Sequence, residues 1–210
     1  MEGGDLSFLL VDNGSTDKSH EILQTVAGRT DGLRSIRLSR NEGYGGGILA
    51  GLATCTVDLV GWTHADLQCD PMDARRALVE AQAARKPERV LVKGTREGRP
   101  WMDSMFSRGM AAFESRLLGV ELSEINAQPT VFSRGLLPSL NHAPMDFRLD
   151  LFAYAAALRA GFEVRRIPVR FPKRTAEEGS NDRLAQKLAT TARLVAGSND
   201  VRKRLDRNPG

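Results

Sequence analysis

The feature that most constrains the fold is an alternation of short apolar runs with longer segments of helical periodicity. The run at 6–11 (LSFLLV) has the length and composition of a buried strand, and 33–38 (LRSIRL) alternates as a strand does. The same patterns predict further strands at 58–63, 89–93 and 163–171, and helices around 22–26 and at 48–53, 72–85, 100–118 and 146–160. Strands that alternate with helices build a mostly parallel sheet flanked by helices. The predicted fold class is therefore α/β.

Composition limits the class of protein. The 210 residues are 41% hydrophobic and 27% charged, which is typical of a soluble globular domain. The sequence has no apolar run near the ~20 residues of a membrane helix, and Cys55 and Cys69 are expected to be reduced thiols. Of the 30 Lys and Arg residues 12 lie in 163–210, against only 6 of the 26 Asp and Glu residues. A basic segment of this kind indicates an anionic partner, or else a solvated helical tail.

Three of the predicted strands end in polar turns, namely 12–17 (DNGSTD), 40–47 (RNEGYGGG) and 64–70 (HADLQCD). Open parallel sheets bind their ligands at the carboxyl ends of the strands. Asp12 can accept hydrogen bonds from a base or a ribose, although the same stretch also fits a plain Asx turn that starts a helix. The glycines of the second turn leave backbone N–H groups open to an anion in front of a helix, unless the loop is simply flexible. We expect the three turns to converge on one ligand site.

The third turn carries the candidate metal ligands. Asp66 is the side chain that we assign to a divalent metal, with His64 two residues before it and Gln68 two residues after it. Mg²⁺ and Mn²⁺ accept substrate phosphates as ligands, so one protein carboxylate can suffice. A histidine ligand shifts the preference toward Mn²⁺. The alternative for His64 is a hydrogen-bonded histidine at a strand end, without a metal.

With these residues laid out, the chain resembles the family 2 glycosyltransferases of GT-A fold, in the branch of dolichol-phosphate mannose synthase and related polyprenyl-phosphate glycosyltransferases. The stretches VDNGSTDKS, NEGYGGGILAGL and ADLQCDP occur in the family's order and at similar spacings, within a resemblance that runs from about 6 to 183. The resemblance implies a nucleotide-sugar donor, Mg²⁺ or Mn²⁺ as cofactor, and inverting transfer to an acceptor such as a polyprenyl phosphate.

The resemblance also implies roles for individual residues. Asp66 would hold the metal on the diphosphate, with His64 and Gln68 as further ligands. Asp66, Arg96 and Arg174 would be catalytic. The implied donor-binding residues are Asp12, Asn13, Asn41, Gly45, Gly46, Ala65 and Asp66. The implied acceptor-binding residues are Arg96, Ser107, Arg108, Arg174 and Ser180.

The chain departs from the family's pattern in three places. The family's opening strand and helix are not found, so we expect an N-terminally truncated sheet that lacks a central strand. His64 replaces the first aspartate of the family's aspartate-x-aspartate element, and 126–129 (NAQP) stands where many relatives have a glycine–phenylalanine motif. The expected organisation is a GT-A-like domain at 1–182, followed by a basic amphipathic helix and tail at 183–210.

The acceptor determines which residues the chemistry needs. A lipid phosphate is already anionic and needs no general base, and Arg96, Arg108 and Arg174 suit it because guanidinium groups pair well with phosphate. A hydroxyl acceptor needs a carboxylate base. Asp146 and Asp150 are the candidates, unless they only compensate the helix dipole. We expect a cytoplasmic protein that binds no nucleic acid and rests its basic C-terminal segment on the inner face of a membrane.

Two alternatives remain open. A dinucleotide-binding oxidoreductase is suggested by Gly45-x-Gly47-x-x-Ala50, with Asp66 near the place of the ribose acid. That reading gives the turn at 12–17 no role. A catalytically degenerate relative that keeps the fold as a binding protein is favoured by the missing strand and by His64.

Overall fold

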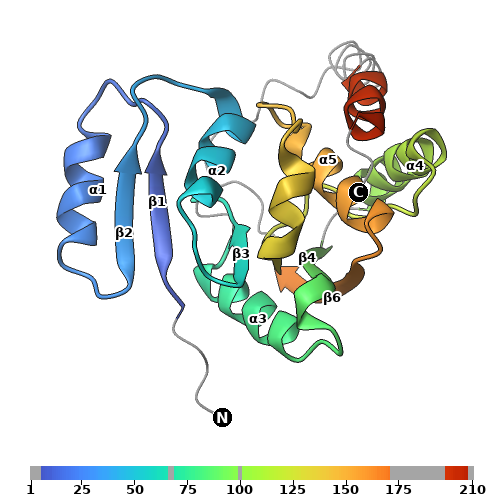
Figure 1. Ribbon diagram of the computed structural model, residues 1–210. Helices are drawn as coiled ribbons and strands as arrows, with labels where there is room; N and C mark the ends of the chain where they lie inside the picture. The colour runs from blue at the N-terminus through green and yellow to red at the C-terminus, as the bar shows by residue number, and fades with distance from the viewer. Residues whose placement is uncertain (1–5, 66–68, 99–100, 171–196, 208–210) are drawn as a thin grey trace.

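The computed structural model describes residues 6–65, 69–98, 101–170 and 197–207 (Figure 1). Every strand and helix that the sequence predicts in this part of the chain is present. The elements are β1 (Phe8–Asp12), α1 (Ser19–Ala27), β2 (Leu33–Arg37), α2 (Gly43–Ala53), β3 (Leu59–Trp62), α3 (Pro71–Gln82), η1 (Pro87–Arg89), β4 (Val90–Glu97), α4 (Trp101–Leu118), β5 (Thr130–Ser133), η2 (Arg134–Leu140), α5 (Leu149–Arg159) and β6 (Glu163–Arg170). The predicted helix within 183–196 lies outside the described residues.

The described strands form two sheets. β1 and β2 pair in parallel, and the second sheet has the order β3-β5-β4-β6. β4 and β6 are parallel, but β5 runs antiparallel to both of its neighbours. β3, β4 and β6 share one direction, so the expected mostly parallel sheet is confirmed, with β5 as the antiparallel exception. The sequence analysis missed β5 because its four residues follow a proline and are too few to show a period.

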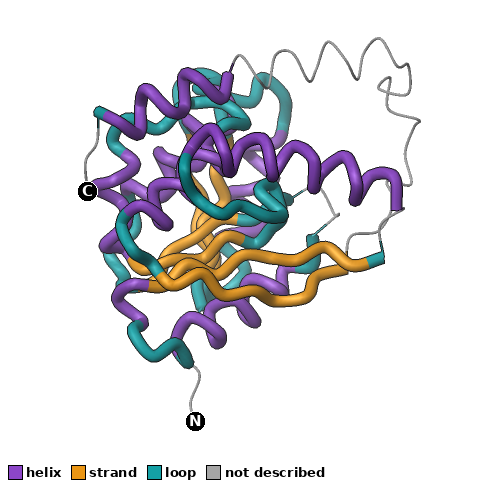
Figure 2. Tube along the Cα trace, turned by 90° about the vertical axis from the view of Figure 1, so that its right-hand side faces the viewer, coloured by secondary structure: helices purple, strands orange, loops and turns teal. Residues whose placement is uncertain are grey.

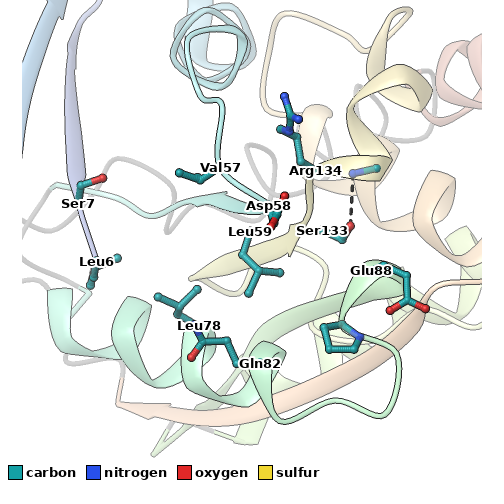
Figure 3. A pocket seen from close by; sticks show the side chains of 12 residues that line it. Leu6, Ser7, Val57, Asp58, Leu59, Leu78, Gln82, Glu88, Ser133 and Arg134 are labelled. Atoms are coloured by element: carbon teal, nitrogen blue, oxygen red, sulfur yellow. Dashed lines mark hydrogen bonds between the residues drawn. The ribbon is translucent and has the colours of Figure 1, made fainter. Parts of the chain in front are cut away.

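β1 and β3 each have a partner strand on one side only within the described residues. In Figure 1 these two strands lie next to each other, with α2 above β3 and α3 below it. A cavity of about 660 Å³ lies between the starts of the two strands, where Leu6, Ser7 and Leu59 line it together with Leu78 and Gln82 of α3 (Figure 3). Of the predicted site residues that the structure describes, none lines the cavity, because it lies at the opposite ends of β1 and β3 from the polar turns.

The main hydrophobic core surrounds α5. All residues of α5 from Leu149 to Ala157 are buried, and the fully buried Phe132 of β5 belongs to the same core. A second cluster joins α3 to the sheet, where Ala77 and Ala81 pack against Val90 and Val92 of β4. Small residues on the helices let the helix axes approach the sheet closely, so the larger sheet is held firmly from both sides.

Residues 197–206 form a further helix that packs on the domain. Val201 and Leu205 are buried in the main core, and the Ser198 hydroxyl donates a hydrogen bond to Glu114 of α4. Figures 1 and 2 both show this helix beside α4. It is therefore part of the domain's core, although the sequence analysis placed it in a C-terminal segment. Within the described residues no helix has both the length and the apolar content to cross a membrane.

Candidate active site

The turns after β1 and β2 are joined by side-chain hydrogen bonds. The Asn13 amide donates to the carbonyl oxygen of Gly43 at 2.8 Å and to Asn41 Oδ1 at 3.3 Å, and Asn13 Oδ1 accepts from the Glu42 N–H. Asn41 Oδ1 in turn accepts from the Gly43 N–H at 2.8 Å. The expected convergence of these two turns is confirmed, and the two asparagines are what holds them together.

Asp12 lies beneath this junction at the end of β1. Its side chain is fully buried, with Oδ1 accepting from the Ser15 N–H and Oδ2 lying 3.5 Å from both His20 Nδ1 and Arg37 Nε. The hydrogen bond from Ser15 and the two nearby basic groups hold the pKa of the Asp12 carboxyl below its usual range. Asp12 Oδ2 has no hydrogen-bond partner among the described residues. Asp12 is thus a buried anion with an unused acceptor, and the expected Asx turn lies at the end of the segment, where Asp17 Oδ1 accepts from the Ser19 N–H at 2.9 Å.

The glycine-rich segment is helical where the sequence predicted a turn. α2 begins at Gly43, so Gly45 and Gly46 lie in its first turn, and the Gly46 N–H donates to the Met145 carbonyl oxygen at 3.1 Å. A Cβ on Gly45 would come within 2.5 Å of the Pro144 carbonyl oxygen. These glycines are therefore needed for close packing against the segment before α5. The expectation of an open anion cradle fails for the Gly46 N–H, because Met145 already uses it.

His64 follows β3 and contacts the second turn through Tyr44. The two rings are stacked with centroids 5.6 Å apart, and Tyr44 stacks on its other side against Phe147 at 4.6 Å. The third turn therefore joins the first two, and all three predicted turns form one cluster. We call Asp12, Asn13, Asn41, Tyr44 and His64 the strand-end cluster.

Several predicted residues lie outside the described part of the chain. These are Asp66, Gln68, Arg174 and Ser180. Ala65 is exposed at the edge of the strand-end cluster, and Asp70 caps α3 by accepting from the Met72 N–H at 2.9 Å. Among described residues no group of three acidic, histidine or cysteine side chains is placed to hold a metal. His64 is thus the one predicted metal ligand whose position is described.

A buried polar network lies below Tyr44, and no pattern in the sequence indicates it. Asp150 is only 3% exposed; its Oδ2 accepts from the Tyr44 hydroxyl at 2.8 Å and its Oδ1 accepts from Gln128 Nε2 at 2.9 Å. Both carboxylate oxygens are therefore occupied by donors from distant parts of the chain. Asp150 is a structural anchor in this arrangement, so the prediction that it serves as a general base is not supported by its geometry.

Asp146, the other candidate base, is paired on the surface. Its carboxylate accepts several hydrogen bonds from the Arg148 guanidinium, the shortest at 2.7 Å. These hydrogen bonds lower the pKa of Asp146. A carboxylate with a lowered pKa and a guanidinium partner is a weak base, so neither candidate is suited to take a proton from a hydroxyl.

Three cations meet at the end of β4, and two of them were not predicted. We call Lys93, Arg96 and Arg166 the cationic cluster. Lys93 Nζ is fully buried and donates to Thr130 Oγ1 at 2.8 Å, while burial lowers the pKa of Lys93 to about 8. Arg166 donates to the Tyr154 hydroxyl at 2.7 Å and to the Gly94 carbonyl oxygen at 3.1 Å. A lysine within an apolar run and an arginine in a strand carry no motif, which is why the sequence did not reveal them.

The predicted acceptor residues are placed near and beyond this cluster. Arg96 is largely buried, and its Nε donates to Glu124 Oε2 at 2.7 Å. Ser107 is half-buried and Arg108 is exposed, both on α4. β3 and β4 both run antiparallel to β5, so their carboxyl ends lie at one edge of the sheet. At that edge His64 follows β3 and Arg96 lies near the end of β4. This edge is the candidate active site.

The comparison with protein families decides the class of this chain. Residues 2–135 match the family model described as glycosyl transferase family 2. The chain belongs to glycosyltransferase family 2. This membership confirms the resemblance and removes the dinucleotide-binding oxidoreductase from consideration.

Two curated relatives have the same name. Both are called undecaprenyl-phosphate 4-deoxy-4-formamido-L-arabinose transferase. The one from Sodalis glossinidius is 32% identical over 137 residues, which is 64% of this chain and 41% of that protein. The one from Pseudomonas fluorescens is 38% identical over 79 residues, or 37% of this chain and 23% of that protein. The chain thus spans less than half the length of these relatives.

Solved structures with the same fold include glucosyl-3-phosphoglycerate synthase from Mycobacterium tuberculosis. Its complex with Mn²⁺, UDP and phosphoglyceric acid superposes with a TM-score of 0.66 at 20% identity, over 95% of this chain and 67% of that one. Its complex with Mg²⁺ and UDP gives a TM-score of 0.65 at 20% identity, over 92% and 67%. The predicted GT-A fold is confirmed.

Proposed function

We propose that this chain is a transferase that moves a sugar from a nucleoside-diphosphate sugar to an acceptor phosphate, with Mg²⁺ or Mn²⁺ as cofactor. The observation that carries the proposal is the meeting of three strand-end turns in one cluster, through Asn13 and Tyr44. Family membership supports sugar transfer. The complexes of the structural relatives with UDP and Mn²⁺ or Mg²⁺ support the donor and the cofactor.

The donor would lie across the strand-end cluster. Asp12, Asn13 and Asn41 would face the nucleoside, with Gly45, Gly46 and Ala65 along the same edge. His64 offers a ring nitrogen to a metal, and Asp66 and Gln68 offer oxygens. This set fits a cation that takes most of its ligands from the diphosphate. When bound, such a cation neutralises the charge that develops on the departing diphosphate.

The acceptor would approach from the cationic cluster. Arg96 lies there, and Ser107, Arg108, Arg174 and Ser180 are the further residues that we propose for acceptor binding. The state of the two carboxylates at α5 favours a phosphate over a hydroxyl acceptor, since Asp146 is paired with Arg148 and Asp150 is buried with both oxygens occupied. A phosphate oxygen is a nucleophile without help from a base. The names of the curated relatives point to a polyprenyl phosphate.

In the proposed reaction an acceptor phosphate oxygen attacks the anomeric carbon of the donor sugar. The bond between that carbon and the diphosphate oxygen breaks, and its electron pair leaves with the nucleoside diphosphate. Because attack comes from the face opposite the leaving group, the configuration at the anomeric carbon inverts. Asn13 and Asn41 would hold the donor in place, and Arg96 with Arg174 would orient the acceptor. A polyprenyl acceptor would bring the protein to a membrane surface.

The test is transfer of a radiolabelled sugar from UDP-linked and GDP-linked sugar donors to undecaprenyl phosphate, with the Asp66→Ala variant beside the unsubstituted chain. Asp31→Ala is a matched control, since Asp31 is exposed in the turn before β2. We expect metal-dependent transfer in the unsubstituted chain and in the control, and none with Asp66→Ala. Undiminished transfer in Asp66→Ala would reject the metal assignment. Absence of transfer in all three would favour the degenerate binding protein.

A further inference from the structure

Tyr44 lies at the junction of the donor-side turns and the buried network. It occupies the first turn of α2, where a Cβ on Gly43 or on Gly45 would come within 2.6 Å or 2.5 Å of backbone oxygens of Met145 or Pro144. This close packing fixes the backbone on both sides of Tyr44 relative to the segment that leads into α5. The main chain of Tyr44 therefore has little freedom to move.

The hydroxyl of Tyr44 is fixed as well. It donates to Asp150 Oδ2 at 2.8 Å and lies 3.5 Å from Gln128 Nε2. Gln128 and Asp150 are 4% and 3% exposed, so solvent cannot readily replace these hydrogen bonds. Burial next to the Asp150 carboxylate raises the pKa of the Tyr44 hydroxyl, which keeps it a donor. A buried hydrogen bond to a charged group is among the stronger ones.

The ring of Tyr44 is the surface against which His64 rests. The two planes are inclined by 28° at a centroid distance of 5.6 Å, and Phe147 covers the other face of Tyr44 at 4.6 Å and 19°. Offset stacks with centroids about 4.5–7 Å apart are favourable for aromatic pairs. His64 lies two residues beyond Trp62, the last residue of β3, so no strand pairing among the described residues holds it. The stack supplies the restraint that the backbone does not.

We propose that Tyr44 is a positioning residue: its ring, tethered through the hydroxyl to Asp150 and Gln128, orients the His64 imidazole for the divalent cation of the nucleotide-sugar donor. This inference rests on the proposed function. Residues that orient a metal ligand contribute to metal affinity without touching the metal.

The experiment uses the three histidines of the chain, His20, His64 and His142, as NMR probes. Their imidazole resonances are recorded first without cation, and then during titration with Mn²⁺ in the presence of UDP. The variants are Tyr44→Phe, which keeps the ring and loses the tether, and Asp150→Asn, which removes the charged acceptor. Tyr154→Phe is the matched control, since the chain's other tyrosine loses a hydroxyl that is also hydrogen-bonded, in its case to Arg166.

Without cation, we expect Tyr44→Phe to shift the His64 resonance and to leave those of His20 and His142 in place. With UDP, the Mn²⁺ concentration that half-broadens His64 should rise roughly tenfold in Tyr44→Phe and in Asp150→Asn, and stay unchanged in Tyr154→Phe. Unchanged His20 and His142 resonances show that each variant is folded.

Two results would overturn the inference, and they are distinguishable. An unmoved His64 resonance in Tyr44→Phe contradicts the tether alone, whatever Mn²⁺ does. If Mn²⁺ with UDP broadens none of the three histidines in the unsubstituted chain, the donor site of the proposed function fails, and the cation part of the inference fails with it.

Discussion

The two sheets of this chain are packed very differently, although both contribute to the same site. In the larger sheet, β4 begins with five buried residues and all four residues of β5 are buried. In the smaller sheet, Asp12 is the one buried residue of β1, and β2 has none. α1 also has no buried residue, and its Ile22 and Val26 are 60% and 44% exposed. The apolar face predicted for this helix exists, but nothing in the described structure covers it.

This difference shows that the two halves of the site are held by different kinds of contact. The cationic cluster and the Tyr44 network rest on a close-packed core, where each side chain is fixed by its neighbours. The turn at 12–17 follows the smaller sheet, in which only Asp12 is buried. Its position depends on the Asn13 hydrogen bond and on the packing of Gly51 against Val11. We infer that the nucleoside side of the site is the more deformable one.

The largest expected effect is in amide hydrogen exchange. Protection depends on buried contacts, so amides of β4 and β5 should exchange on the order of a hundredfold more slowly than those of β1 and β2. The measurement is exchange followed by mass spectrometry on peptides that separate 6–17 and 33–40 from 88–97 and 128–134. Equal protection of the two sets of peptides would contradict the difference between the sheets, because it would mean that the smaller sheet opens only when the whole domain unfolds.

The next effect concerns the contact between α2 and the segment before α5. Gly45→Ala places a Cβ 2.5 Å from a backbone oxygen, and the resulting overpacking should lower the free energy of unfolding by ~1–3 kcal/mol. Gly109→Ala is the control, since Gly109 lies in α4 with open space around it. This variant should raise the free energy of unfolding by ~0.5–1 kcal/mol. Urea denaturation measures both. A neutral Gly45→Ala would show that the site's two halves are joined more loosely than the structure indicates.

The sequence predicted the local structure well and the long-range contacts poorly. Strands and helices follow from periodicity, and α3 at Pro71–Gln82 lies where a helix is predicted at 72–85. The hydrogen bond between Tyr44 and Asp150 joins residues 106 positions apart, and no local pattern indicates it.

The glycines around Gly45 fit an anion-binding loop and a close helix contact equally well in sequence. Only the position of Pro144 and Met145 separates these two interpretations. A single sequence also cannot show whether a carboxylate such as Asp150 is exposed as a base or buried as an anchor.

The smallest effect is the pH dependence contributed by Asp146. Hydrogen bonds from Arg148 lower its pKa in the folded state. This stabilisation is present above the unfolded pKa of about 3.9 and is lost as the pH falls through the folded value. Asp146 is half-exposed, so the contribution should stay below ~1 kcal/mol. Melting temperatures of Asp146→Asn and the unsubstituted chain should differ at pH 7, and the difference should shrink as the pH falls below about 3.9; a constant difference would contradict this origin.

The central claim is that the strand-end turns bind a nucleoside diphosphate with a divalent cation. Its most direct test is the melting temperature of the chain with UDP or GDP plus Mn²⁺, with NADH as the comparison ligand and Asp66→Ala as the comparison variant. At a hundredfold excess over the dissociation constant, one of the two nucleotides should raise the melting temperature by roughly 5–10 °C. NADH should have no effect, and Asp66→Ala should abolish the rise. No shift with either nucleotide, or an equal shift in Asp66→Ala, would contradict the account.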